Sequence, residues 1–236
     1  MSETVRVYHG SKRGLELWPD RRSLREAKSL EACAIRADRG NPAADFGAGF
    51  YMGTDAHQPQ TLICGGASPV LYTLDLDTTG LKAYEFQPGL DWALFVAFCR
   101  GLVPAGFLET PFARRYREIR DGHDLIRGKI ANDRIFNTVQ AFFRNELTDA
   151  ALVHALQALN LGDQVCAKTA AACARVTIVE SRTLSAAECE GLQVKAENQR
   201  QTAVRETDRI RVQFRREGSY FDEILDRMAK EGVECP

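Results

Sequence analysis

The chain has 236 residues, a formal net charge of −1 and a hydrophobic fraction of 44%. This length fits one large domain or a domain with an appendage, and the composition is typical of a globular protein with a packed core. A near-neutral charge argues against a strongly basic nucleic-acid-binding protein, although it leaves room for a local basic patch.

Seven cysteines are scattered along the sequence, and no two of them form a C-x-x-C pair. The sequence therefore lacks the signature of a zinc ribbon or a thioredoxin-type redox motif, and it predicts buried free thiols in a reducing compartment. The first residues hold no apolar signal core, and no run approaches the roughly 18 apolar residues of a membrane helix. We expect a cytoplasmic protein that does not bind the membrane.

Taken in chain order, hydrophobic patterns predict the secondary structure of residues 1–184. Alternating or β-branched segments predict strands, and apolar residues at helical spacing predict helices. The predicted strands are 4–8, 68–76, 123–130, 163–168 and 176–179. The predicted helices are 24–34, 58–64, 91–100, 132–145 and 149–159. Of these, the segment 91–100 (DWALFVAFCR) predicts a buried helix that is capped by Asp91.

The composition changes after about residue 184. Residues 188–231 include no proline and few bulky apolar side chains, and residues 195–217 hold seven basic and four acidic residues. This pattern predicts a long exposed helix followed by a short amphipathic helix. We therefore divide the chain into a domain at residues 1–184 and a helical C-terminal extension at 185–236. We expect the domain to fold without the extension.

The glycine-rich stretch 45–55, DFGAGFYMGTD, contains two misleading motifs. Its DFG triplet is the magnesium-binding motif of protein kinases, but the other kinase loops are absent from the sequence. Its glycines are spaced G-x-G-x-x-x-G, one residue longer than a dinucleotide fingerprint, and no apolar strand precedes them. A metal site is not predicted either, because the four histidines share no metal-ligand spacing.

Four other motifs follow one another along the chain. They are YHGS at 8–11, FGAGFY at 46–51, DLIRGKIAND at 124–133 and QVC at 164–166. In this order they resemble the ADP-ribosyltransferase superfamily, in the branch that diphtheria toxin shares with the poly(ADP-ribose) polymerases and that has a His-Tyr-Glu triad. The chain is more closely similar to a bacterial family within that superfamily, whose members combine these motifs. The resemblance covers residues 4–180.

The resemblance implies an α+β fold, in which two small antiparallel sheets form an NAD cleft, helices flank the sheets and a helical appendage follows. NAD is then the substrate. The triad positions fall on His9, Tyr51 and Gln164, where Gln164 stands in place of the usual glutamate. The other residues that the resemblance places at the NAD site are Gly10, Ser11, Phe46, Gly47, Gly49, Phe50 and Asp133.

Cleavage of the bond between nicotinamide and ribose needs groups that orient the ribose, hold the nicotinamide and stabilise positive charge on the sugar. One ring nitrogen of His9 suits a ribose hydroxyl while the protein holds the other. Gly10 lets the backbone approach the nicotinamide amide, and the Tyr51 ring stacks on the nicotinamide. Structural alternatives stay open, namely a strand-end histidine, core aromatics in a glycine turn and, for Asp133, a helix start.

Gln164 is the weak point of this mechanism. An amide can hydrogen-bond a ribose hydroxyl, but it neither accepts a proton nor supplies negative charge. Activity is then slow, or the acceptor is a strong nucleophile, or Asp163 supplies the charge from the loop before the strand.

We expect mono-ADP-ribosyl transfer from NAD. The resemblance implies a bacterial toxin or a component of a toxin–antitoxin pair, with a cognate antitoxin or another protein as partner. The alternatives are an NAD glycohydrolase and a non-catalytic module that binds NAD, ADP-ribose or a protein. The acceptor stays open, and a nucleic acid is among the candidates.

Overall fold

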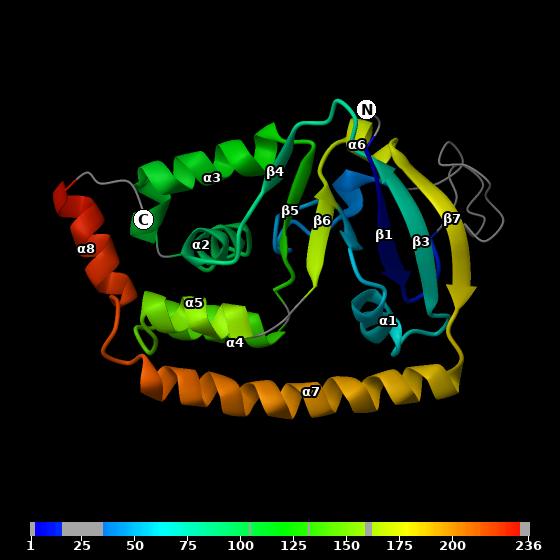
Figure 1. Cartoon of the computed structure of the whole chain (residues 1–236). Coiled ribbons are helices and arrows are strands. Elements are labelled where there is room, and N and C mark those ends of the chain that lie inside the picture. Colours follow the sequence, from blue (N-terminus) through cyan, green and yellow to red (C-terminus); the bar gives the residue numbers. More distant parts are fainter. Residues whose placement is uncertain (1–2, 16–34, 104, 132, 159–161, 232–236) are drawn as a thin grey trace.

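The computed structural model describes residues 3–15, 35–103, 105–131, 133–158 and 162–231. It has the predicted α+β architecture, with one sheet and a group of helices beside it (Figure 1). The helix predicted at 24–34 lies outside the described residues. The strands and helices predicted between residues 57 and 179 are found close to their predicted bounds.

Within the described residues, seven strands form a single sheet in the order β4-β5-β6-β2-β1-β3-β7. They are β1 (Thr4–Ser11), β2 (Phe50–Gly53), β3 (Val70–Asp77), β4 (Ala83–Glu85), β5 (Leu125–Lys129), β6 (Asp163–Ala167) and β7 (Val176–Thr183). Neighbours are antiparallel except β4 and β5, which are parallel. β1 and β2 are joined through one registered pair, Tyr8 and Gly53. One mixed sheet with a narrow junction at that pair thus replaces the two small sheets that were expected.

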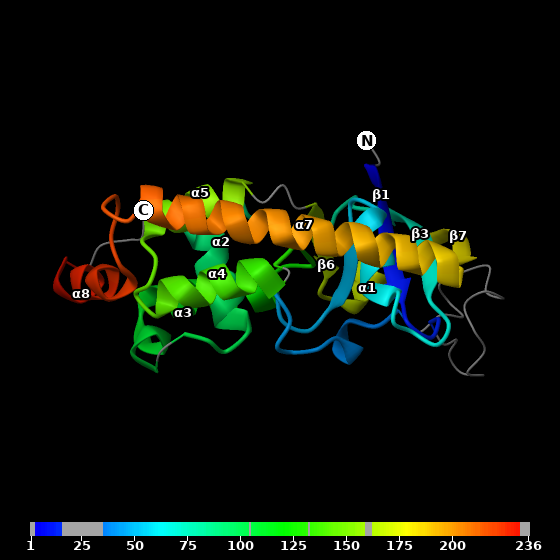
Figure 2. The same cartoon turned by 90° about the horizontal axis from the view of Figure 1, so that it is seen from below.

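Helices occupy much of the remaining chain. They are α1 (His57–Ile63), α2 (Leu90–Cys99), α3 (Pro111–Gly122), α4 (Asp133–Phe143), α5 (Asp149–Ala158), α6 (Ala170–Cys173), α7 (Ala186–Gln213) and α8 (Phe221–Glu231). Short 3-10 segments lie at Ala37–Arg39 and Ala105–Glu109. In Figures 1 and 2, helices α2 to α5 gather at the β4 end of the sheet, and α7 runs past the whole molecule from β7 toward α8.

α2 is buried on all sides, as its apolar sequence predicts. Every one of its residues except Asp91 is buried. The predicted helix cap is wrong, because α2 begins at Leu90 and Asp91 lies inside its first turn. The Asp91 carboxylate instead accepts hydrogen bonds from Arg115 at 2.7 Å and from the Tyr116 hydroxyl at 2.8 Å. Asp91 therefore connects α2 to α3, which provides both donors.

The C-terminal extension consists of the two predicted helices, and it contributes to the core at both ends. Cys189, near the start of α7, belongs to a buried cluster with Ile63 and Leu71. Ile210, near the end of α7, and Phe221 of α8 are buried in the main core. The boundary near residue 184 falls between β7 and α7, but these contacts argue against a domain that folds without its extension.

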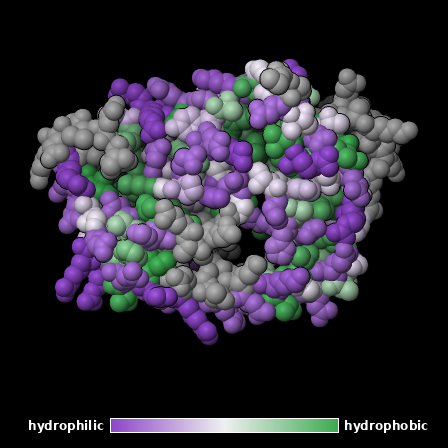
Figure 3. Space-filling model, viewed as in Figure 1, coloured by the Kyte–Doolittle hydropathy of each residue, from purple (hydrophilic) through white to green (hydrophobic). Residues whose placement is uncertain are grey.

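The outer surface is mostly polar in the view of Figure 3, where apolar side chains are scattered among hydrophilic ones. Within the described ranges, no helix combines the length and the apolar character that crossing a membrane requires. The five cysteines for which the structure gives a state are free thiols, four of them buried and Cys64 partly exposed. The prediction of buried free thiols is confirmed for those four.

Candidate functional site

His9 lies on β1, and its imidazole is held from one side. The ring Nδ1 lies 2.7 Å from the backbone carbonyl oxygen of Tyr51 on β2, so Nδ1 carries the proton and donates it. The ring stacks on Phe50, with 4.4 Å between the centroids. Burial lowers the pKa of His9 below its usual value of 6.5, which favours the neutral ring. The other nitrogen, Nε2, is then a hydrogen-bond acceptor.

Tyr51 uses its hydroxyl to close the glycine-rich loop that leads into β2. The hydroxyl accepts from the Phe46 N–H at 2.8 Å and donates to the Gly47 carbonyl at 2.7 Å. Gly47 has a φ of +76°, a conformation that glycine adopts at no steric cost. The Tyr51 ring lies beside that of Phe46, and burial raises the pKa of its hydroxyl. The side chain expected to stack on nicotinamide is therefore half-buried and fixes its own loop.

Close contact with β6 explains the small residues of this loop. A Cβ on Gly49 would lie 2.2 Å from the Sγ of Cys166, so the loop backbone passes directly over β6. Just after β6, the Lys168 ammonium donates to the carbonyl oxygens of Phe46, at 2.6 Å, and of Ala48. Burial lowers the pKa of Lys168. Lys168 was not predicted as a site residue, because its partners lie about 120 residues earlier in the chain.

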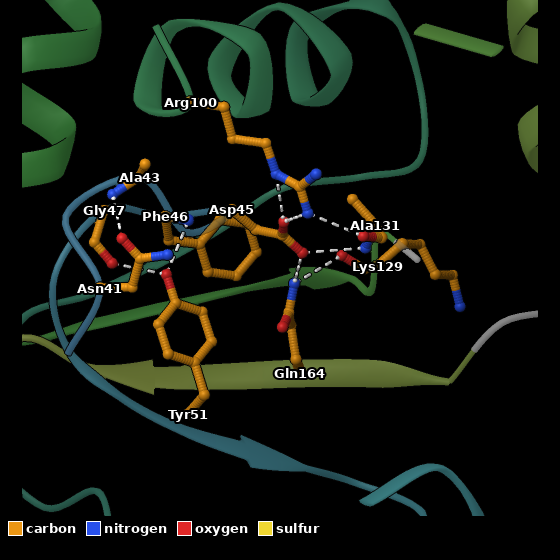
Figure 4. A network of polar contacts seen from close by, with 10 residues as sticks. All are labelled: Asn41, Ala43, Asp45, Phe46, Gly47, Tyr51, Arg100, Lys129, Ala131 and Gln164. Atoms are coloured by element: carbon orange, nitrogen blue, oxygen red, sulfur yellow. Dashed lines mark hydrogen bonds and ion pairs between the residues drawn. The ribbon is translucent and has the colours of Figure 1, made fainter. Parts of the chain in front are cut away.

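Asp45, at the start of the loop, is the centre of a buried polar network (Figure 4). One carboxylate oxygen accepts from the guanidinium of Arg100, which follows α2, and the other accepts from the Ala131 N–H at 3.0 Å. Gln164 donates its Nε2 to that second oxygen at 2.7 Å and to the Lys129 carbonyl at 3.2 Å. Asp45 and Gln164 are 6% and 7% exposed. The Gln164 amide group thus has both of its N–H donors occupied by the protein itself.

The three triad positions lie on neighbouring strands but not on one face of the sheet. Side chains alternate along a strand, so Phe50, which contacts His9, and Tyr51 point to opposite faces. Tyr51 pairs with Cys166 across β2 and β6, and Gln164 lies two residues before Cys166 on the same face. In Figure 4, Tyr51 and Gln164 both point toward the loop that carries Asp45. The structure therefore brings Tyr51 and Gln164 together and separates the His9 ring from both.

Asp163 and Gln164 point to opposite faces of the sheet. Asp163 points to the face that carries His9. It is the first residue of β6 rather than a loop residue, and it alternates with Gln164 along that strand. Its carboxylate lies 2.9 Å from the Nζ of Lys129 and 3.6 Å from the guanidinium of Arg127. This group is a partly exposed acid on the face of the sheet that carries the histidine.

The other residues expected to bind NAD have varied surroundings. Phe46 and Phe50 are core residues, 0% and 6% exposed. A Cβ on Gly10 would lie 2.6 Å from a carbonyl oxygen of α1, so the close backbone approach at this glycine is made by a helix of the protein. Ser11 ends β1, and the side chain of Asp133 lies outside the described residues. Ligand binding by these residues stays a prediction.

Across the described part of the chain, no group of three or more histidine, cysteine, aspartate or glutamate side chains is placed to hold a metal ion. The charged side chains around the glycine-rich loop instead pair with one another, as Asp45 does with Arg100.

The fold and the site define an α+β protein whose glycine-rich loop is tied to the sheet by a buried network of an aspartate, an arginine and a glutamine. Residues 27–178 match the model of a family described as a protein of unknown function (DUF3990). This match covers more than half of the chain, so the chain belongs to that family. The matched residues include Tyr51 and Gln164 but not His9. No curated protein and no solved structure matches the chain.

Proposed function

We propose that this protein is a mono-ADP-ribosyltransferase that uses NAD as its donor. The observation that carries the proposal is the hydrogen bond of 2.7 Å from Nδ1 of His9 to the Tyr51 carbonyl. It supports a neutral imidazole of fixed orientation, whose Nε2 accepts a hydrogen bond from a ribose hydroxyl. The order of the YHGS, FGAGFY and QVC motifs supports it through the resemblance to the ADP-ribosyltransferase superfamily. The same resemblance extends the proposal to a bacterial toxin or toxin–antitoxin component with a cognate antitoxin.

In the proposed reaction, the bond between C1′ of the ribose and the nicotinamide nitrogen breaks, and its electron pair leaves with nicotinamide. The ribose develops oxocarbenium character, as in glycoside hydrolysis. A nucleophile of the acceptor then bonds to C1′ and loses its proton. NAD lies on the His9 face at the junction of β1 and β2, and Asp163 supplies negative charge toward the reacting sugar. Gln164 holds the glycine-rich loop through Asp45 and has no acid–base role.

The test uses the full chain and NAD that is labelled in both the nicotinamide and the adenosine part. Free nicotinamide, free ADP-ribose and ADP-ribose bound to macromolecules are separated after incubation with a cell lysate. The proposal expects free nicotinamide together with bound ADP-ribose, and His9→Ala should reduce both. Free ADP-ribose in place of bound ADP-ribose would identify an NAD glycohydrolase instead.

A second candidate is a module that binds NAD or ADP-ribose without turnover. The Gln164 amide favours it, because both of its N–H donors are buried on Asp45 and on the Lys129 carbonyl. The position that is usually a catalytic glutamate then has only a structural role. Calorimetric binding of NAD with no release of nicotinamide would support this candidate and refute the transferase.

A further inference from the structure

The C-terminal half of α7 and the turn after it expose arginines around a valine. Arg205, Arg209 and Val212 are spaced by four and three residues and share one face of α7, which ends at Gln213, and Arg216 follows in the turn. This arginine face consists of Arg205, Arg209, Val212 and Arg216. All four are exposed, and Val212 is 67% exposed, whereas Ile210 on the opposite side of the helix is buried. Hydrophilic side chains also project at the lower left of Figure 3, where α7 ends.

The arginines of this surface are mostly unpaired. Over the ranges that the structure describes, Arg205, Arg209, Arg215 and Arg216 make no salt bridge. Arg211 lies 3.8 Å from the carboxylate of Glu146, and both side chains are about half exposed. A surface pair of this length contributes little, so the guanidinium can change partners. Positive charge on this surface is therefore available to a negatively charged partner.

A pocket of about 310 Å³ opens beside the arginine face, where α7 passes the start of α5. Its apolar lining comes from Leu147 and Ala151, which are buried, and from Val212, which it shares with the arginine face. Arg211 and Arg215 also line it, together with polar side chains of Glu146, Thr148 and Tyr220. The combination offers a cavity with an apolar part and two arginines in its lining.

We propose that the arginine face and this pocket form a docking surface for an acidic segment of a partner protein that inserts one apolar side chain. Guanidinium groups pair with carboxylates through two parallel hydrogen bonds, which gives both charge and shape recognition. A nucleic-acid backbone would satisfy the arginines but has no apolar side chain for the pocket. The inference goes beyond the proposed reaction and needs no NAD.

The test measures binding of two fluorescein-labelled peptides to the full chain by fluorescence anisotropy. Both peptides are short runs of glutamate, one with a central leucine and the other with serine at that position. The leucine peptide should bind roughly tenfold more tightly, because burying a leucine is worth that much or more. Val212→Ser should reduce this preference, and Arg215→Glu should weaken binding of both peptides roughly fivefold or more. Arg114→Glu, an exposed arginine on α3, is the matched control and should change neither affinity.

Several results would overturn the proposal. Equal affinity for the two peptides would mean that the surface attracts acidic peptides by charge alone and that the pocket binds no apolar side chain. Unchanged binding by Arg215→Glu would mean that the peptides bind elsewhere. Stronger binding of a short oligouridine would identify a nucleic-acid site, and displacement of the peptide by inorganic phosphate at constant ionic strength would identify an anion site. A dimer in sedimentation velocity that Val212→Ser abolishes would assign the surface to a second copy of the chain.

Discussion

Gln164 and Asp45 are bound to each other across 119 residues of sequence, with 2.7 Å between the amide Nε2 and the carboxylate Oδ2. Arg100 and the Ala131 N–H occupy the rest of the carboxylate. The network needs a hydrogen-bond donor at position 164, and a glutamine provides one whereas an ionised glutamate does not. The proposed transferase assignment expects a glutamate at this position, and the glutamine that stands there has a physical reason in the partner that this side chain contacts.

The first prediction is that Gln164→Glu destabilises the protein. Two carboxylates would face each other in a buried site, and the Lys129 carbonyl would lose its donor, at a cost of about 1–3 kcal/mol in the free energy of unfolding. Urea unfolding at pH 7 measures this loss, which should shrink at pH 5 as one carboxylate becomes protonated and donates to the other. Gln87→Glu, at an exposed position, is the control and should change stability by less than about 0.5 kcal/mol. A variant as stable as the wild type would refute the network.

Most regular elements follow from local patterns in the sequence. Alternating or β-branched segments predicted β3 and β6, and apolar residues at helical spacing predicted α4 and α5. These predictions succeeded because each pattern is contained within one element. α3 was missed although its signals are present: Thr110 caps it, Pro111 is at its start, and Phe112, Tyr116 and Ile119 form its buried side. The role of Asp91 was misjudged because a cap and a contact to another helix use the same carboxylate.

The site was only partly predictable. The held nitrogen of His9 was expected from the chemistry of imidazole, and the structure supplies the partner in the Tyr51 carbonyl. The roles of Asp45 and Lys168 could not be read from the sequence, because their partners lie 55 to 122 residues away along the chain. The face on which each triad position lies depends on strand register, which no local motif fixes.

The second prediction concerns the close contact of the glycine-rich loop with β6. Gly49→Ala would place a Cβ 2.2 Å from the Sγ of Cys166, so the loop must move and the protein should lose about 1–3 kcal/mol of stability. Cys166→Ala removes the sulfur, and the double variant should recover part of the loss in a thermodynamic cycle. Strictly additive effects of the two substitutions would contradict the contact. Gly65→Ala, where an added Cβ meets nothing, is the control.

The third prediction replaces the expectation that the domain folds alone. A chain that ends at residue 184 lacks Cys189, Ile210 and Phe221, which are buried, and should aggregate or melt without a cooperative transition. Phe221→Ala in the full chain should lower the free energy of unfolding by about 3–5 kcal/mol. Val212→Ala on the exposed side of α7 should change it by less than about 0.5 kcal/mol. A soluble truncated chain with a sharp calorimetric transition would instead support the expectation that residues 1–184 fold without the extension.

The fourth prediction is a pH dependence that arises from His9. Burial lowers its pKa in the folded chain below the unfolded value near 6.5, so the unfolded chain binds more protons between those two pKa values. The stability that His9 contributes is present above about pH 6.5 and is lost as the pH falls below it. The difference in unfolding free energy between wild type and His9→Asn should therefore decrease from pH 7.5 to 5.5. A difference that stays constant over this range would mean that His9 titrates alike in both states.

The last prediction distinguishes the roles of Asp163 and Gln164, which are adjacent at the start of β6. It rests on the proposed transferase activity. Asp163 lies on the His9 face, whereas Gln164 points to the opposite face and binds Asp45. Asp163→Asn keeps the size of the side chain and removes the charge that stabilises the oxocarbenium centre. Nicotinamide release per folded molecule should then fall by about 100- to 1000-fold, the range for removal of one electrostatic stabilising group.

Gln164→Ala gives the complementary result. It breaks the bond to Asp45, so its main effect should be a loss of about 1–3 kcal/mol in stability, with a smaller effect on the rate per folded molecule. Thermal unfolding and a nicotinamide release assay on the same samples separate these two effects. Wild-type rates for Asp163→Asn together with abolished release for Gln164→Ala would return the third triad position to Gln164. A wild-type chain that binds NAD and releases no nicotinamide would leave both residues structural and favour the binding module.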